Sequence, residues 1–259
     1  MSDRQLTFRG VTAVWSRHFW LYRKTFIVNC IAPISEPVIY LLAFGLGLSP
    51  LIKTVQLSGI SVEYLNFLAP GMIAVAVLFQ SFFEGAYGTF IRITFQQTWA
   101  AQLATPLTFN EIFVGDWLWA ATKGIIAGTI TGLVAVIWGA IPLISLISHL
   151  PVIFLGSVIF AALGLTTAGW VRTVDQINLP VFLFVVPMFT LCGTYFPREG
   201  LPLPLRAISA MLPLSPLIDL LRSHLNVPTP LFTDVIVLLG WLIGLGMLSF
   251  RLLTKKVFR

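Results

Sequence analysis

The chain has 259 residues, of which 57% are hydrophobic and 10% are charged, and its formal net charge is +6. A soluble domain carries about 25% charged residues, so this composition excludes a soluble globular fold and predicts a surface that faces mostly lipid. We attribute the positive charge to a Lys/Arg excess on one side of a membrane, and we expect no nucleic-acid partner. The length suits a single transmembrane domain over residues 1–259.

The N-terminal segment Gly10–Lys24 mixes aromatic residues such as Trp15 and Trp20 with the cations Arg17 and Arg23. This mixture predicts a helix that lies in the membrane interface, with its aromatic rings at headgroup level and its cations near anionic lipid. The alternative is a cytoplasmic extension of the first membrane helix.

Apolar segments long enough to cross a bilayer, which takes about 20 residues, recur along the chain. Gly124–Val171 is the longest stretch without Lys, Arg, Asp or Glu, at 48 residues, and Ile141-Pro142 and His149-Leu150-Pro151 divide it into two spans. The sequence thus predicts an all-α integral membrane protein with six transmembrane helices, at about Phe26–Leu48, Phe67–Phe90, Ile112–Ala140, Pro151–Trp170, Leu179–Phe196 and Thr233–Leu253.

The Lys and Arg residues divide unequally between the two sides that these spans define. Eleven of the 16 fall on the side of the termini and four on the other side, while Lys123 lies inside a span. Because cytoplasmic loops carry the excess of Lys and Arg, we expect both termini in the cytoplasm.

The cytoplasmic segment between the second and third spans has a composition unusual for a free loop. A short helix over Phe95–Ala104 would bring Trp99, Gln102 and Leu103 within one or two turns of one another. An exposed Trp and Leu have little use in a solvated loop, so the pattern predicts an element that docks on another protein.

Charged residues within spans are the sharper feature, since each costs a few kcal/mol to insert. Glu84 and Lys123 have similar depths near the cytoplasmic side, so an ion pair between them is geometrically possible. Such a pair can be a static link between helices or part of a polar lining or gate. Glu36 is deeper, lies between Pro33 and Pro37, and is expected to cap freed backbone groups or face a cavity.

The outer segment Pro197–Pro230 contains seven prolines and is too apolar for a plain loop. Leu205–Leu212 and Leu217–Leu225 are predicted as short helices that re-enter the membrane, with an extracellular flap as the alternative. Asp219 and Arg222 are three residues apart, a spacing that permits a side-chain pair.

No enzyme motif is present: the sequence has no G-x-x-x-x-G-K-[ST] loop for nucleotide phosphates and no paired-His metal motif. We therefore predict that this chain is not an enzyme and has no cofactor. A secondary transporter is the alternative from another class, but neither an internal repeat nor an acidic cluster supports it.

Several segments, in order along nearly the whole chain, resemble type 2 ABC-exporter permeases of the nodulation-factor (lipo-oligosaccharide) export group. They are Glu36-Pro37-Val38-Ile39-Tyr40 to Leu48, Tyr64-Leu65-Asn66-Phe67-Leu68-Ala69-Pro70-Gly71-Met72, Gln97-Thr98-Trp99 with Ala104-Thr105-Pro106-Leu107-Thr108, Trp119-Ala120-Ala121-Thr122-Lys123, and Phe196-Pro197 followed by Leu212-Pro213 to Arg222. The segment Pro197-Arg198-Glu199-Gly200 departs from the spacer usual in that group.

The resemblance implies a permease that exports an amphiphile, such as a lipo-oligosaccharide or glycolipid, across the bacterial inner membrane; a hydrophobic drug or a polysaccharide is the alternative cargo. It also implies a homodimer that binds two copies of a separate ABC ATPase, which holds the ATP and Mg²⁺. Phe95–Ala104 would be the cytoplasmic coupling helix, with Gln97, Thr98, Trp99, Gln102 and Leu103 as ATPase-coupling residues. Phe196, Pro197, Asp219 and Arg222 would belong to the re-entrant exit side.

Overall fold

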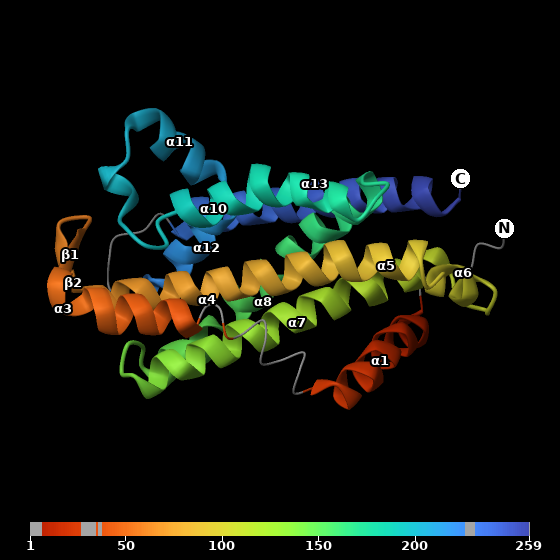
Figure 1. Ribbon diagram of the computed structural model, residues 1–259, viewed down its shortest axis with the longest axis horizontal. Helices are drawn as coiled ribbons and strands as arrows, with labels where there is room; N and C mark the ends of the chain where they lie inside the picture. The colour runs from red at the N-terminus through yellow and green to blue at the C-terminus, as the bar shows by residue number, and fades with distance from the viewer. Residues whose placement is uncertain (1–6, 27–34, 36–37, 226–230, 259) are drawn as a thin grey trace.

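The computed structural model describes residues 7–26, 35, 38–225 and 231–258. Four helical stretches in these residues are long and apolar enough to cross a membrane, and they run side by side in one bundle (Figure 1). They confirm the second, third, fourth and sixth predicted spans. Their bounds are Tyr64–Thr94, which comprises α4 (Tyr64–Phe83), the π-helix η2 (Glu84–Gly88) and α5 (Thr89–Thr94), then α7 (Phe109–Ile137), α8 (Leu143–Trp170) and α13 (Leu231–Val257).

The other two predicted spans correspond to shorter apolar helices. Much of the first predicted span lies outside the described residues, and its described end is Val38–Ile52, with the π-helix η1 (Ala43–Leu48) and α3 (Ser49–Ile52). The fifth is Asp175–Leu191, assembled from η3 (Asp175–Ile177), α9 (Asn178–Pro180), η4 (Val181–Val185) and α10 (Val186–Leu191). Two prolines interrupt this stretch, and proline cannot donate the backbone hydrogen bond of a regular helix.

The two spans are separated at Ile141-Pro142 as predicted, but the second part of the predicted break, at His149-Leu150-Pro151, is wrong. Helix α7 ends at Ile137, α8 begins at Leu143 directly after Pro142, and Pro151 lies inside α8. Neighbouring helices and local adjustment let membrane helices tolerate an internal proline, so Pro151 does not end this one.

A β-hairpin that the all-α prediction missed follows α3. Strands β1 (Thr54–Leu57) and β2 (Ile60–Glu63) pair in antiparallel register with Leu57 opposite Ile60. The two connecting residues, Ser58 and Gly59, both have positive φ (50° and 82°), as a two-residue hairpin turn requires. The Ser58 backbone N–H and hydroxyl donate to Glu199 Oε1 at 2.9 and 3.0 Å, which ties the hairpin to a distant loop.

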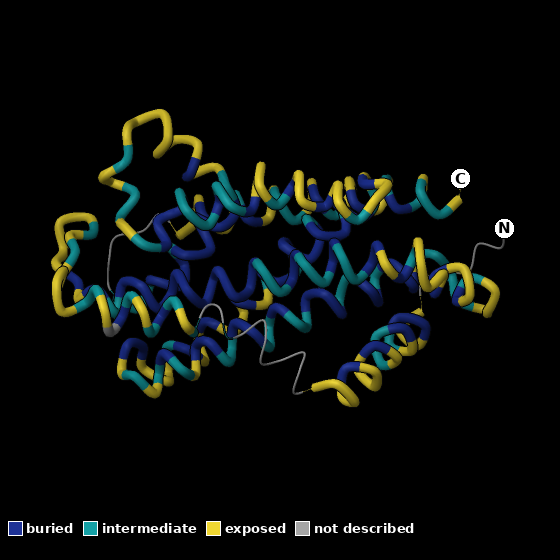
Figure 2. The backbone as a smooth tube through the Cα atoms, in the orientation of Figure 1, coloured by how far each residue is buried: buried dark blue, intermediate teal, exposed yellow. Residues whose placement is uncertain are grey.

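Helix α4 lies at the centre of the bundle and is buried on nearly all sides (Figure 2). It packs against α7, α8 and α12 (Leu214–Leu221), while α8 also packs against α13. The span crosses α8 most closely where Gly85 meets Gly164: a Cβ on Gly164 would lie 2.4 Å from the Phe82 carbonyl oxygen. Small residues thus permit the backbone contact that holds the two spans together.

Helix α1 (Phe8–Lys24) is a separate helix that packs along α7 and ends at Lys24. Thr7 caps its first turn and also donates to Glu111 of α7, while Trp15 Nε1 donates to Thr122 Oγ1 at 3.0 Å. Helices α1 and α5 and the last turns of α13 lie at one end of the bundle, and the hairpin and α11 (Leu203–Met211) lie at the other (Figure 1).

The proline-rich segment that begins at Pro197 contains the predicted pair of short helices, shifted by a few residues. After η5 (Arg198–Gly200), α11 (Leu203–Met211) and α12 (Leu214–Leu221) meet at an angle of 82°, and η6 (Ser223–Leu225) follows. Helix α12 is buried against α4, α8 and α13, whereas α11 is mostly exposed.

The contact between Gly85 and Gly164 leads to a test of the packing. We expect Gly164→Ala to lower stability by about 1–3 kcal/mol, since the added methyl group meets backbone atoms that cannot move aside. Thermal unfolding of the purified chain in detergent measures the change. The matched control is Gly240→Ala, where nothing lies within 4 Å of the added carbon; equal melting temperatures for the two variants would contradict the packing argument.

Candidate functional site

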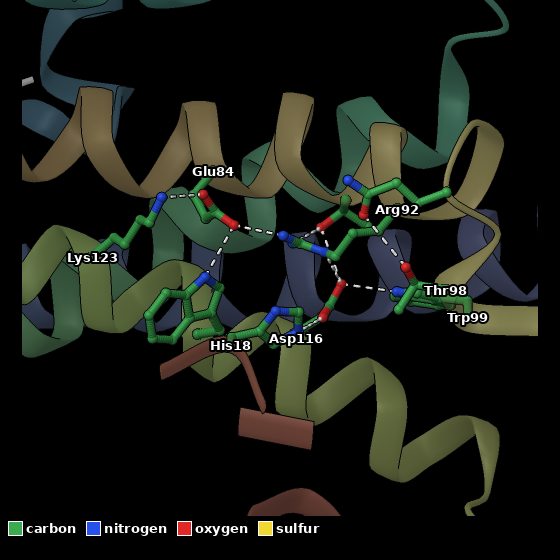
Figure 3. A network of polar contacts seen from close by, with 10 residues as sticks. His18, Glu84, Arg92, Thr98, Trp99, Asp116 and Lys123 are labelled. Carbon is green, nitrogen blue, oxygen red and sulfur yellow. Dashed lines mark hydrogen bonds and ion pairs between the residues drawn. The ribbon is translucent and has the colours of Figure 1, made fainter. Parts of the chain in front are cut away.

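The described residues hold one extended network of buried charged side chains, at the end of the bundle that carries α1 and α5 (Figure 3). Its members come from α1, η2, α5, α7 and α6 (Thr98–Leu103), so elements far apart in sequence meet in it. Two carboxylates, Asp116 and Glu84, accept most of its hydrogen bonds.

Asp116 is the fully buried centre of the network, with 0% of its surface exposed. His18 Nε2 lies 2.6 Å from its Oδ1, while Arg92 Nε and Trp99 Nε1 donate to its Oδ2 at 3.0 and 2.9 Å. Thr89 adds a longer contact at 3.4 Å. A carboxylate can be buried only with such partners, so Asp116 holds α1, α5 and α6 against α7.

Glu84 forms the second half of the network. Lys123 Nζ donates to its Oε2 at 2.6 Å, so the ion pair considered from sequence is present. Arg92 Nη1 and Trp119 Nε1 donate to its Oε1 at 2.6 and 3.1 Å. Since Arg92 contacts both carboxylates, the two halves form one connected set.

The π-helix η2 aligns Glu84 with Arg92. The two are eight residues apart, and in a regular α-helix of 3.6 residues per turn they would point about 80° apart. The wider turns of η2 (Glu84–Gly88) bring both onto the face toward α7. Single π-turns inside α-helices often occur at functional sites.

The structure places α6 differently from the exposed docking helix that the sequence predicts. Trp99 is 1% exposed and Gln102 is 9% exposed, because the Trp99 indole needs an acceptor and finds it in Asp116. Thr98 is also buried, Leu103 is half-buried and Gln97 is exposed. The predicted exposure of Trp99 is therefore wrong, and Gln102, expected beside it on the docking element, is buried as well. The exposed side of α6 is formed by Ala100 and Ala101, with Gln97 exposed directly before the helix.

At the other end of the molecule, Asp219 and Arg222 do not pair with each other. Asp219 forms its ion pair with Arg198. Arg222 is 2% exposed, donates through Nη2 to the carbonyl oxygens of Phe67 and Gly193 at 2.9 and 2.8 Å, and lies over the Phe67 ring. Phe196 is exposed and Pro197 is half-buried beside them.

Sequence reasoning missed three members of the network, His18, Arg92 and Asp116. Arg92 entered the sequence analysis only as one of the eleven cations counted on the side of the termini, and His18 only as part of the interfacial segment Gly10–Lys24. An Asp inside an apolar span was nevertheless a signal that partners had to exist. Glu36, predicted as an intramembrane polar residue, lies outside the described residues.

The hydrogen bonds of the network join helices to one another. Both carboxylates are saturated by donors, and the described residues contain no group of three or more His, Cys, Asp or Glu side chains that could hold a metal ion. The network can couple the positions of α1 and α6 to those of the spans. A shift of α1 or α6 would strain the hydrogen bonds of Asp116, which lies inside α7.

The network predicts unequal effects for its two deeper charges. Glu84→Gln leaves Lys123 and Arg92 without their shared carboxylate, whereas Lys123→Met leaves Glu84 paired with Arg92. Breaking a buried pair costs about 3–5 kcal/mol, so we expect Glu84→Gln to lower the unfolding free energy by that order and Lys123→Met to lower it less. Denaturation in detergent gives both values.

The double variant completes this test. Glu84→Gln leaves Lys123 without a carboxylate, whereas Arg92 keeps Asp116. Since Lys123→Met removes that orphaned charge, the double variant should lose less than the sum of the single variants. Additive losses would show that Glu84 and Lys123 do not interact.

Comparison with known proteins agrees with this architecture. Residues 9–225 match the family model of the ABC-2 type transporter. The chain is 38% identical over 210 residues to nodulation protein J of Rhizobium leguminosarum bv. viciae, covering 81% of this chain and 80% of that protein. It is 36% identical over 219 residues to nodulation protein J of Neorhizobium galegae (84% and 82% covered) and 32% identical over 211 residues to that of Bradyrhizobium diazoefficiens (82% and 79% covered). The chain is therefore a multi-pass membrane protein that belongs to the ABC-2 type transporter family, as an ABC transporter permease.

Proposed function

We propose that the chain is the membrane subunit of an ATP-driven exporter that moves a lipo-oligosaccharide or related glycolipid out across the bacterial inner membrane. Two copies of the chain would form the path, and two copies of a separate ABC ATPase would bind ATP and Mg²⁺. The similarity to nodulation protein J supports this cargo class over the alternatives, a hydrophobic drug or a polysaccharide.

The observation that carries the proposal is the attachment of α6 to the charges inside the spans. Trp99 of α6 donates to Asp116, Arg92 links Asp116 to Glu84, and Glu84 in turn binds Lys123. A force applied to α6 by an ATPase would thus reach charged contacts within α4–α5 and α7. We propose this chain of contacts as the path that couples ATP hydrolysis to rearrangement of the spans.

The outer face of α6 offers the docking surface for the ATPase. Gln97, Ala100 and Ala101 are exposed on it, and the small side chains allow close approach of another backbone. In this proposal Trp99 and Gln102 act from the inner face, by holding α6 on the bundle. Leu103 is half-buried between the two faces.

The outer segment would close the exit of the path. Helix α12 packs among three spans, which supports a re-entrant position, while Asp219 and Arg222 hold it through Arg198 and two backbone carbonyls. Phe196 and Pro197 would lie at the rim of this exit.

Two α6 variants separate docking from coupling. Ala101→Arg should reduce co-purification of the cognate ATPase, since a bulky cation then occupies the docking face. Trp99→Phe keeps a ring but removes the N–H donor to Asp116, a contact worth about 1.5–3 kcal/mol, so it should lower ATP turnover of the reconstituted complex while the ATPase still binds.

Ser61→Arg is the matched control, because it places the same side chain on an exposed position of the hairpin at the far end. The docking role of α6 fails if Ala101→Arg retains as much ATPase as Ser61→Arg does. The coupling role fails if Trp99→Phe turns over ATP like the unmodified chain.

The proposed orientation has both termini in the cytoplasm. Single cysteines in place of Lys53 and Arg206, in a chain lacking Cys30 and Cys192, should react with a membrane-impermeant maleimide added to intact cells. A cysteine in place of Arg172 should react only after permeabilisation, since cytoplasmic loops carry the Lys/Arg excess. Labelling of the Arg172 position in intact cells would reverse the topology.

A further inference from the structure

A cavity of about 380 Å³ lies beside the charge network, between α1 and the α4–α5 span with α7. Arg17, Glu84, Arg92 and Lys123 supply its charged lining. The ion pairs of the network explain how Glu84, Arg92 and Lys123 hold the helices together. They explain neither the position of Arg17 nor the open space beside these side chains.

The lining carries more positive than negative charge. Three cations face one carboxylate, Glu84, which already accepts hydrogen bonds from Arg92, Lys123 and Trp119. Asp116 neutralises Arg92 from the far side. Arg17 is exposed at the mouth, and none of the described acidic residues forms an ion pair with it. The cavity therefore attracts an anion.

The remaining wall is apolar and reaches the surface. Leu21 is 52% exposed and Ile91 is 36% exposed at the rim, and the rings of Tyr22 and Trp119 lie deeper. From Arg92 to Glu84 the cavity follows the helix axis for roughly 12 Å at 1.5 Å per residue, which is about the depth from headgroup to upper acyl chain. A small free anion would leave this apolar wall unused.

We propose that the cavity binds one anionic phospholipid, with its phosphate near Arg17 and Lys123 and an acyl chain along Leu21 and Ile91. Basic pockets between membrane helices are suited to anionic headgroups. We assign this lipid to the cytoplasmic leaflet. The leaflet rests on the orientation proposed above, whereas binding of the lipid to the cavity does not depend on it. By filling the gap between α1 and the spans, the lipid would stabilise the position of α1.

Native mass spectrometry of the purified full-length chain tests the site with phosphatidylglycerol as the probe and phosphatidylcholine as the neutral-headgroup comparison. We expect phosphatidylglycerol to bind more tightly. Arg17→Gln should weaken its binding about fivefold, the effect of about 1 kcal/mol for one cation near a headgroup. Arg17 takes part in no described ion pair, so this variant should fold.

Arg23→Gln is the matched control, since Arg23 is also an exposed cation of α1 but does not line the cavity. It should leave phosphatidylglycerol affinity unchanged. Equal affinity for the two lipids, or equal losses in the two variants, would overturn the proposal and leave only general attraction to α1. If glycerol 1-phosphate displaces the lipid at equal concentration, the site is one for free phosphate, and the lipid assignment is wrong.

Discussion

A single buried carboxylate sets the arrangement of the end of this permease that carries α1 and α6. Asp116 lies inside a span with none of its surface exposed, and an unpaired charge there would cost several kcal/mol. Its donors come from three other elements: His18 on α1, Arg92 on α5 and Trp99 on α6. Each of these elements is short or lies at the edge of the bundle, so the need to satisfy one carboxylate fixes where they lie.

Glu84 extends this constraint toward the middle of the bundle. Because Arg92 binds both carboxylates, neither can lose its partners without affecting the other. The π-turns of η2 make the shared contact possible by rotating Arg92 onto the face of Glu84. At the same level, Gly85 and Gly164 let the backbone of this span touch α8. The π-helix η2 and the close contact between Gly85 and Gly164 therefore lie at the same level of the bundle. The ion pairs of Glu84 thus act on the part of this span that packs most tightly against α8.

The membrane spans were predictable because lipid imposes both their length and their composition. Hydropathy alone located α4–α5, α7, α8 and α13, with ends within a few residues except for the start of α8. It could not show that Pro151 continues a helix, since tolerance of that proline depends on the neighbours that pack around it. Nor does it register a hairpin of four-residue strands, whose turn depends on two positive φ angles.

Side-chain partners were less predictable than helices, and for a physical reason. Glu84 and Lys123 have similar depths in adjacent spans, and depth alone was enough to suggest their contact. Trp99 looked like a docking residue because the local pattern does not reveal Asp116, 17 positions later, as its acceptor. Asp219 likewise takes Arg198 from another segment instead of Arg222, three residues away. Spacing along one helix shows which pairs are possible, but a buried charge binds whichever donor the tertiary fold brings nearest.

The two ends of the molecule satisfy buried charge in different ways. At the end that carries α1, cations meet carboxylates on neighbouring helices. At the end that carries the hairpin, Arg198 pairs with Asp219, but Arg222 forms no ion pair with a described carboxylate and donates to the carbonyl oxygens of Phe67 and Gly193. Gly193 has a φ of 82° at the end of α10, where a helix leaves carbonyls without partners, so the guanidinium supplies the donor that lipid cannot. Backbone contacts therefore hold α12 against the start of α4, in addition to the ion pair between Asp219 and Arg198, whereas the ion pairs at the end that carries α1 join side chains to one another.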